Sequence, residues 1–317
     1  MKRVALVFTG GTISMRPDAA AGGLRPAMSG AEILARVDGL DRIAEVEVVD
    51  WGLVPASHMS MATILELAAL MGELLGRPDI DGVVLVQGTD TIEETAFAFD
   101  LLLPPDQPVV VTGAMRDTSA ADYDGPRNIL EAVGHAALDA AQDRSGVTVV
   151  LGGVAVGAEA VVKAHATAMD AFRRREGAAE HPWKRLPRLP GPREAVDDVH
   201  LIVATTGMHG TLVRGVAGGR PRGLVIAATG SGNTHPDLLA AATELMGSGT
   251  IVALTTRTAG GMVTPGYAFP GGGATWLRAG ALMSRLDGLK TRVALALALA
   301  AGLGREEIAE LIGPAAA

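Results

Sequence analysis

The sequence of 317 residues contains no cysteine, and this absence restricts the chemistry that it can perform. Without thiols there is no disulfide bond, no thiolate nucleophile and no cysteine-ligated metal site. Any catalysis must therefore use oxygen and nitrogen groups. Lysine is also scarce, since it supplies only four of the 27 basic residues. A lysine inside an apolar stretch is therefore a conspicuous feature of this sequence.

Aromatic residues make up only 3% of the chain, so the core must be built from alanine, valine, leucine and isoleucine. Such a composition is typical of parallel strands that are covered by helices on both faces. Hydrophobic residues account for 48% and charged residues for 20%, which predicts a folded globular protein. Because single cores stop growing near about 250–300 residues, we expect two α/β domains.

The sequence has no basic surplus and no long apolar run. Its formal charge of −8 gives no electrostatic footprint for a nucleic acid. The cluster Arg173–Arg175 is interpreted as a solvated surface segment. No stretch approaches the roughly 18 uncharged residues of a membrane span, and the first apolar run, Val4–Phe8, is shorter than the ~7–15 residues of a signal core. These observations predict a cytoplasmic protein with no nucleic-acid and no membrane partner.

Short apolar runs alternate with longer amphipathic ones in the first half of the chain, which predicts β-α-β units and a parallel sheet. The predicted strands are Val4–Phe8, Val46–Val49, Gly82–Val86, Val109–Thr112 and Val147–Leu151. The predicted helices are Gly30–Arg36, Ser60–Leu75, Thr91–Leu103 and Pro126–Ala141.

A proline-rich segment without helical or strand periodicity, residues 186–198, is the predicted linker. It separates a larger domain of residues 1–185, with a mostly parallel sheet flanked by helices, from a smaller Rossmann-like α/β domain of residues 199–317. The strands predicted in the second domain are Leu201–Thr205, Gly223–Ala227 and Thr250–Leu254, and the helices are Pro236–Met246 and Leu289–Ala301.

Glycines and hydroxyl residues follow three predicted strands of the first domain, where α/β sheets bind their ligands. The loops are Thr9–Thr12, Gln87–Thr91 and Gly113–Arg116. Glycines let the backbone approach a ligand, and Thr12 and Thr89 offer nucleophiles to a neighbouring base. A threonine hydroxyl needs a proton acceptor, and Asp90 by itself is a weak base, so we regard Lys163 as a candidate. The residues alone leave open that the threonines cap helices and that Lys163 lies at the surface.

These motifs resemble those of the bacterial-type L-asparaginases and glutaminase-asparaginases. Thr9-Gly10-Gly11-Thr12-Ile13 is similar to the first family motif, and Gln87-Gly88-Thr89-Asp90-Thr91 is similar to the second, in which histidine usually stands at the position of Gln87. Two such motifs about 75 residues apart are specific. Further similarity covers nearly the whole chain, through Thr112–Arg116, Asp124–Asn128, Lys163 and Gly230–Asn233.

The resemblance implies an amidohydrolase that releases ammonia from L-asparagine and that needs no metal and no organic cofactor. It implies that Thr12 attacks the amide carbon to form an acyl-enzyme, while Thr89, Lys163 and Asp90 relay protons. The same resemblance implies that Asp90 also binds the substrate's α-amino group. The remaining residues implied in substrate binding are Gly11, Gly88, Ala114, Met115 and Ser57, the last one place off the family position.

The sequence departs from the family pattern in the loop after Thr12. Residues Ser14–Ser29 have the composition of a mobile lid but lack the family's tyrosine. Tyr267 is a possible substitute from the second domain or from a neighbouring subunit. Asn233 and His235 are further candidates there, because the family usually places an amide side chain near His235.

Several alternatives stay open at the level of the sequence. The substrate is L-asparagine, or alternatively glutamine, D-asparagine or another small amide, and a catalytically weak amino-acid-binding relative is a further alternative. A nucleotide-binding protein is disfavoured, since neither glycine loop fits G-x-G-x-x-G. The resemblance also implies a homodimer or homotetramer.

Overall fold

The computed structural model describes residues 1–104, 106–138, 146–178, 189, 191 and 194–313. The chain divides into two compact units. Of the described residues, unit 1 contains Met1–Arg174, and unit 2 contains Arg175–Ala178 together with residues 189, 191 and 194–313. The predicted domain boundary at residue 185 and part of the predicted linker 186–198 lie outside the described residues.

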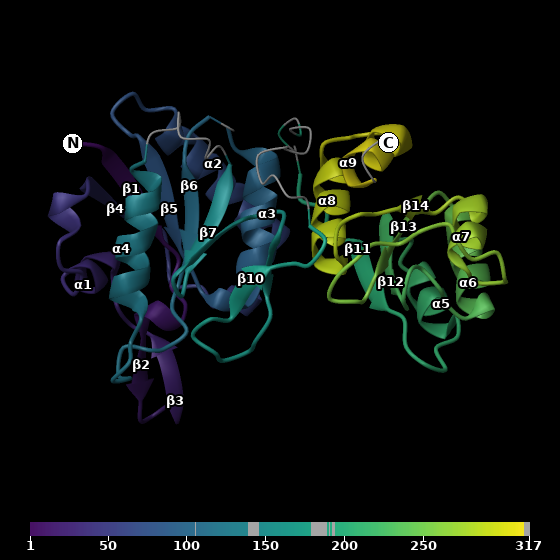
Figure 1. The fold of residues 1–317 in the computed structure, drawn as a ribbon, viewed down its shortest axis with the longest axis horizontal. Helices are drawn as coiled ribbons and strands as arrows, with labels where there is room; N and C mark the ends of the chain where they lie inside the picture. Colours follow the sequence, from purple (N-terminus) through teal and green to yellow (C-terminus); the bar gives the residue numbers. More distant parts are fainter. Residues whose placement is uncertain (105, 139–145, 179–188, 190, 192–193, 314–317) are drawn as a thin grey trace. The chain divides into compact units, whose positions relative to one another are not determined.

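Unit 1 contains a six-stranded sheet whose strands are parallel except at one edge (Figure 1). In spatial order its strands are β4 (Glu45–Asp50), β1 (Arg3–Phe8), β5 (Gly82–Val86), β6 (Val109–Thr112), β7 (Val147–Leu151) and the antiparallel β8 (Val154–Gly157). Strands β1, β5, β6 and β7 follow from short valine-rich runs, because strands buried on both faces have no polar alternation. Strand β4 lies at the edge and is only partly buried. The first five strands coincide with the predicted ones to within one residue at each end.

The strand order places the candidate loops at one point of the sheet. From β1 the chain first adds β4 on one side and then crosses to add β5 on the other, so that the order reverses between β1 and β5. In open α/β sheets, ligands bind outside the carboxyl ends of the strands at such a reversal. The loop that follows β1 carries Thr12, and the loop that follows β5 carries Thr89.

Helices cover both faces of this sheet. One face packs against α1 (Gly30–Leu34) and α4 (Gly125–Ala136), with Leu6, Val84 and Ile129 in the shared core. The other face packs against α2 (Met61–Leu75) and α3 (Ile92–Leu102). Local sequence fixes two of the helix starts. Ser29 and Glu32 form a capping box at α1, and the side chain of Ser60 accepts from the backbone of Thr63 at α2.

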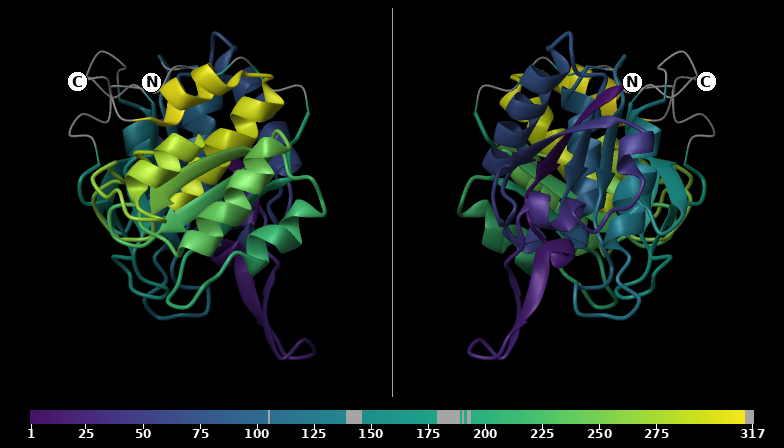
Figure 2. Two further views of the ribbon diagram at one scale, coloured as in Figure 1. Left: turned by 90° about the vertical axis from the view of Figure 1, so that its right-hand side faces the viewer. Right: turned by 90° about the vertical axis from the view of Figure 1, so that its left-hand side faces the viewer.

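Two short hairpins of unit 1 were not predicted. The first, β2 (Met15–Asp18) with β3 (Gly23–Pro26), follows the candidate nucleophile loop and extends away from the main sheet in both views of Figure 2. It contains most of the segment whose composition suggested a lid. The second, β9 (Val161–Lys163) with β10 (Phe172–Arg174), places Phe172 opposite Lys163. Strands of three or four residues carry too few apolar positions to show a period in the sequence.

Unit 2 is a smaller α/β unit with a four-stranded, wholly parallel sheet. Its strands, in spatial and in chain order, are β11 (Val199–Val203), β12 (Gly223–Ala228), β13 (Ile251–Thr256) and β14 (Leu282–Met283). One face packs on α5 (Thr211–Ala217), α6 (Pro236–Gly247) and α7 (Gly273–Ala279), and α8 (Gly288–Ala300) packs on the other, with α9 (Arg305–Ile312) beside α8. The predicted fold class, two α/β domains with mostly parallel sheets, is therefore confirmed.

Four predictions from the sequence need correction. Helix α1 ends at Leu34 and not at Arg36. Helix α4 ends at Ala136 and not at Ala141, since the backbone of Ala137 already closes the last turn, and residue 141 lies outside the described residues. Strand β11 begins and ends two residues earlier than predicted, and β13 ends two residues later. In both strands the hydrogen bonds to β12 set the limits, which a hydrophobic run does not reveal.

We expect a large loss of stability when the buried face of β1 is truncated. Leu6 is 0% exposed, whereas Val48, its partner on the edge strand β4, is 38% exposed. Leu6→Ala should lower the free energy of unfolding by about 2–5 kcal/mol, because it leaves a cavity in a packed core. The matched variant Val48→Ala should cost about 1 kcal/mol or less. Denaturant unfolding of both variants checks the difference, and equal losses would contradict this assignment of the core.

Candidate functional site

The loops after β1 and β5 touch through their backbones. Gly11 has a φ of 90°, and a methyl group placed on its Cα would lie 2.3 Å from Gly88 Cα, well inside any permitted contact. The backbone N–H and the hydroxyl of Thr9 both donate to the carbonyl of Val86, at 3.0 and 3.2 Å. Only glycine fits at Gly11, because it allows both the positive φ and the close approach.

The loop after β6 and the turn after β4 join the same edge of the sheet. A Cβ on Gly113 would lie 2.4 Å from the carbonyl oxygen of Gln87 and 3.2 Å from Thr89 Cγ2. The Thr91 hydroxyl donates to the carbonyl of Ala56 at 3.2 Å, which brings in the 3-10 turn Ala56–His58. The candidate residues after four strand ends therefore gather at the carboxyl edge of one sheet.

Lys163 reaches this edge from the β9–β10 hairpin. Its amine donates to Thr89 Oγ1 at 3.0 Å and to Asp90 Oδ1 at 2.9 Å. The Lys163 side chain is 13% exposed and Thr89 is buried, whereas the Asp90 side chain is 69% exposed. The amine and the threonine hydroxyl are thus shielded, and most of the Asp90 carboxylate remains open to a cationic group from outside.

Thr12 begins a short 3-10 turn, Thr12–Ser14, directly after the glycine that touches the second loop. Thr12 is half-buried. The turn is stabilised by the hydroxyl of Ser14, which donates to the carbonyl of Gly11 at 2.9 Å. The geometry presents the Thr12 residue at the surface of the same loop cluster. Of the other candidates in unit 1, Ala114 is buried, Met115 is half-buried and Ser57 is exposed.

Gln87 is completely buried beneath the second loop, although sequence reasoning gave it no role. Its amide nitrogen lies 3.4 Å from the carbonyl of Gly88 and from the hydroxyl of Thr95, and its amide oxygen has no hydrogen-bond partner among the residues that the structure describes. Those distances are at the long end of the normal range. The Gln87 side chain therefore stabilises the loop more by packing beneath it than by hydrogen bonds.

Three candidates, Asn233, His235 and Tyr267, belong to unit 2 and make their contacts there. The backbone N–H of Asn233 donates to the carbonyl of Thr229, and its side-chain oxygen is buried and accepts no hydrogen bond within the described part of the chain. His235 is exposed and caps α6, because its Nδ1 accepts from the backbone of Asp237 at 3.2 Å. The ring of Tyr267 is half-exposed and stands 5.5 Å from another aromatic ring of its own loop. His235 thus has a structural role at the start of α6, and the assignments of all three residues to the site are proposals.

The run of arginines at 173–175 was interpreted as a solvated segment, and for its last member this is wrong. Arg173 and Arg174 are exposed, but Arg175 is only 6% exposed. Its guanidinium donates to the carbonyls of Gly261 at 2.6 Å and of Arg285 at 3.2 Å. A buried guanidinium is tolerated because the carbonyl oxygens replace its water, a contact that composition does not reveal.

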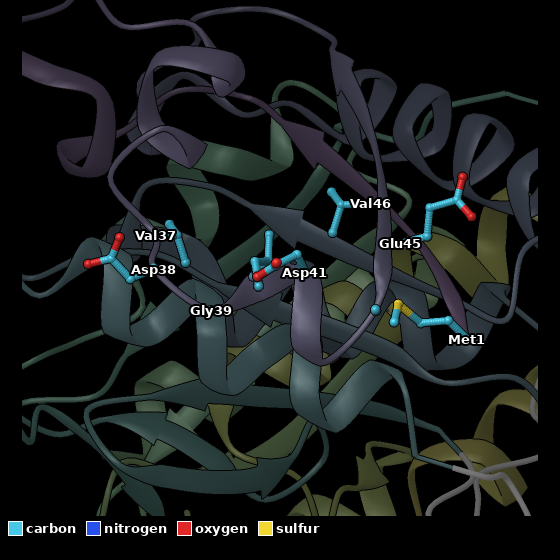
Figure 3. Close-up of a pocket in the computed structure, with 9 residues that line it drawn as sticks. Met1, Val37, Asp38, Gly39, Asp41, Glu45 and Val46 are labelled. Carbon is cyan, nitrogen blue, oxygen red and sulfur yellow. The ribbon is translucent and has the colours of Figure 1, made fainter.

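An open depression of about 720 Å³ in unit 1 lies away from these residues (Figure 3). It is lined by Met1, by Val37–Asp41 and by the start of β4, which places it at the amino ends of the strands. The candidate loops follow the carboxyl ends.

Among the described residues no three histidines, aspartates or glutamates are grouped so that they could hold a metal ion. No helix in the described part of the chain is long and apolar enough to cross a membrane.

Tyr123, the other of the two tyrosines, donates through its hydroxyl to the carbonyl of Ile13 at 2.8 Å. Burial raises the pKa of Tyr123 to about 12, above the ordinary value of 10.0. The unfolded chain should therefore lose this proton near pH 10, while the folded chain keeps it until about pH 12.

We expect the free energy of unfolding to fall with rising pH in this window, because only the unfolded state releases the proton. Lysine and arginine also titrate here, so the measurement is a comparison between the unmodified protein and Tyr123→Phe. Unfolding curves at several pH values between 9 and about 12 should show a shallower decline for the variant. Parallel declines would contradict the raised pKa.

The contact between Gly11 and Gly88 can be tested against a glycine of similar φ. Gly22, in the β2–β3 turn, has a φ of 67°, and nothing lies within 4 Å of a Cβ placed there. Gly22→Ala should cost about 1–2 kcal/mol for the left-handed backbone alone. Gly11→Ala should cost more, and it should also disrupt any activity of the site, since the second loop must move. Thermal unfolding and an activity assay check this, and equal effects of the two substitutions would contradict the close approach.

Comparison with known proteins agrees with this architecture over the whole chain. Residues 3–181 match the family model "Asparaginase, N-terminal", and residues 198–312 match the model "Glutaminase/Asparaginase C-terminal domain". A probable L-asparaginase from Deinococcus radiodurans is 38% identical over 97% of this chain and 96% of its own length. An L-asparaginase from Bacillus licheniformis is 28% identical over 94% of this chain and 96% of its own length.

A solved structure has a similar fold. The probable cytoplasmic L-asparaginase from Campylobacter jejuni superimposes with a TM-score of 0.84 at 25% identity, and the match covers 98% of this chain and 99% of that one. Both domains, their order and their sheets are thus shared. The chain belongs to the asparaginase family of amidohydrolases.

Proposed function

We propose that this protein hydrolyses L-asparagine to L-aspartate and ammonia through a threonine nucleophile. The observation that carries the proposal is the hydrogen bond of 3.0 Å between the amine of Lys163 and the hydroxyl of Thr89, beside the glycine contact that joins the first two loops. The names of two relatives support the substrate, since one is named a probable L-asparaginase and the other an L-asparaginase.

In the proposed acylation step, the Thr12 oxygen attacks the side-chain amide carbon of the substrate. An ester bond to Thr12 forms, the carbon–nitrogen bond breaks, and the hydroxyl proton leaves with the nitrogen as ammonia. Water then attacks the ester carbon, which releases aspartate and restores the Thr12 hydroxyl. Backbone N–H groups of the Gly88 loop would stabilise the oxyanion, and such a donor is worth about 3 kcal/mol in other hydrolases.

Lys163 and Thr89 form the proposed proton relay. Their heavy-atom distance lies within the range for direct proton transfer, and both groups are shielded from water. The exposed carboxylate of Asp90 has two roles in this proposal. One oxygen holds the amine of Lys163, and the open side receives the α-ammonium group of the substrate.

The remaining candidates fit around this relay. Ser57, exposed in the turn beside Gly88, would bind the substrate α-carboxylate, and the carbonyl of Ala114 would accept from the leaving amide. Asn233, His235 and Tyr267 are proposed contributions of the second domain. We further propose a homodimer or homotetramer in the cytoplasm, and the location is supported by the solved neighbour, which is named a probable cytoplasmic L-asparaginase.

Ammonia release from L-asparagine, L-glutamine and their D forms tests the function and ranks the substrates. Thr12→Ala, Thr89→Val and Lys163→Met should each lower kcat by about a thousandfold or more, because each removes a group of one catalytic unit. The control is Thr243→Val, which changes an exposed hydroxyl on α6 of unit 2 and should leave kcat unchanged.

Circular dichroism should show that all four variants are folded. Full activity in Thr12→Ala and Thr89→Val would contradict the assignment of the nucleophile and the relay. An unmodified protein that releases ammonia from none of the four amides would contradict the function. Tight aspartate binding without turnover would favour the amino-acid-binding alternative, which is motivated by the absence of tyrosine from the β2–β3 hairpin.

A further inference from the structure

The segment Tyr123–Asn128, at the start of α4, hydrogen-bonds to three of the loops that follow strands of unit 1. Asp124 holds the loop after β6, Asn128 holds that loop and the turn after β7, and Tyr123 holds the loop after β1. None of the three was assigned a role from the sequence. Each is buried or half-buried, so these bonds are shielded from water.

The Asp124 carboxylate is directed at the loop and not at its own helix. Asp124 occupies the N-cap position of α4, where an aspartate usually accepts from the first turn, but its side chain makes no such bond. Instead Oδ2 accepts from the backbone N–H of Met115 at 3.0 Å and Oδ1 from that of Arg116 at 2.9 Å. The stabilisation normally given to the helix end is therefore given to the loop.

Asn128 extends the same network on both of its amide atoms. Its nitrogen donates to Asp124 Oδ2 at 2.8 Å and to the carbonyl of Gly113 at 2.9 Å, and its oxygen accepts from the backbone of Gly152 at 3.2 Å. Asp124 is 6% exposed and Asn128 is 1% exposed. Buried polar groups that are fully paired fix one geometry, because any other leaves a donor or acceptor unsatisfied.

Tyr123 makes the third connection, on the nucleophile side. Its hydroxyl donates to the carbonyl of Ile13, the residue directly after Thr12, over a separation of 110 positions in the sequence. The 3-10 turn that presents Thr12 is thus held by two contacts. Gly11, just before the turn, lies against Gly88, and Tyr123 binds the carbonyl of Ile13 within the turn.

We propose that Tyr123 and Asp124 are positioning residues of the reaction, with separable effects. Asp124 fixes the backbone of Gly113–Arg116, which includes the carbonyl of Ala114 that would contact the substrate amide, and so it controls substrate binding. Tyr123 fixes the turn of Thr12 and so controls the rate of attack. This inference rests on the proposed function, because it assigns the two loops their parts in amide hydrolysis.

The test measures kcat and KM for L-asparagine in Asp124→Asn, Tyr123→Phe and Asp122→Asn. The last is the matched control, since Asp122 is exposed, directly precedes this segment and, among the described residues, hydrogen-bonds to the side chain of Arg116 and to no loop backbone. In Asp124→Asn one loop N–H faces an NH₂ group, and KM should rise about tenfold while kcat stays within about threefold. Tyr123→Phe should lower kcat about fivefold with KM unchanged. Asp122→Asn should change neither value.

For Asp124→Asn a purely structural role would not give this pattern, because loss of folded protein lowers kcat and leaves KM unaltered. For Tyr123→Phe, kcat is therefore calculated per folded protein, with the folded fraction of each variant measured by circular dichroism. The proposal is overturned if KM of Asp124→Asn equals that of Asp122→Asn in an active enzyme, or if Tyr123→Phe retains the full kcat. Hydrogen exchange of the Met115 and Arg116 amides gives a readout that does not depend on activity, and it should be about tenfold faster in Asp124→Asn. An inactive unmodified enzyme would contradict the proposed function, whereas unchanged exchange would contradict the positioning itself.

Discussion

The backbone contact between Gly11 and Gly88 is the constraint on which the candidate site depends. Two parallel strands that lie side by side, β1 and β5, end at the same edge of the sheet, and their loops meet there without any intervening side chain. The strand order reverses between them, and in open α/β sheets such a reversal leaves a crevice outside the carboxyl ends of the strands. The close approach brings the loop of Thr12 against the loop of Thr89, and this proximity is required by any mechanism that uses both residues.

Elements distant in sequence supply what these two loops lack. Lys163 lies 74 positions after Thr89 and comes from a three-residue strand that is held by pairing with β10. Tyr123, Asp124 and Asn128 come from the start of α4 and fix the flanking loops from the side. The site thus combines loops that are rigid through hydrogen bonds with one shielded amine and one exposed carboxylate. Such an arrangement gives a preorganised centre for acyl transfer.

Much of the fold could be predicted from the sequence, and the reason is the strength of its apolar runs. The first five strands of the large sheet are short, valine-rich and bounded by glycine, polar or charged residues, so their limits were accurate to within one residue. The β9 and β10 strands were missed because three residues show no period, and their pairing depends on the rest of unit 1. The end of α4 was wrong because helix propensity continues through the alanines beyond Ala136, where the structure ends the helix.

Part of the candidate site could be proposed from the sequence. Thr12 and Thr89 follow from the position of their loops at strand ends, Asp90 and Lys163 were candidate proton acceptors from the residues themselves, and the resemblance added the role of each. Nothing in the run of arginines indicated that Arg175 is buried among carbonyl oxygens while Arg173 and Arg174 are exposed. Nor did the sequence indicate that the Asp124 carboxylate serves a loop instead of its helix. Both facts depend on which partners the folded chain brings within hydrogen-bonding distance.

The sequence by itself determined the α/β class, the order of the first strands, the absence of thiol chemistry and the glycine loops that carry the two threonines. These features are local, since each is fixed by composition or by a run of neighbouring residues. Only the tertiary structure decided that the amine of Lys163 lies 3.0 Å from Thr89 and that Tyr123 reaches Ile13. Contacts of that kind join residues 74 and 110 positions apart, and they exist only after the strands have paired and the helices have packed.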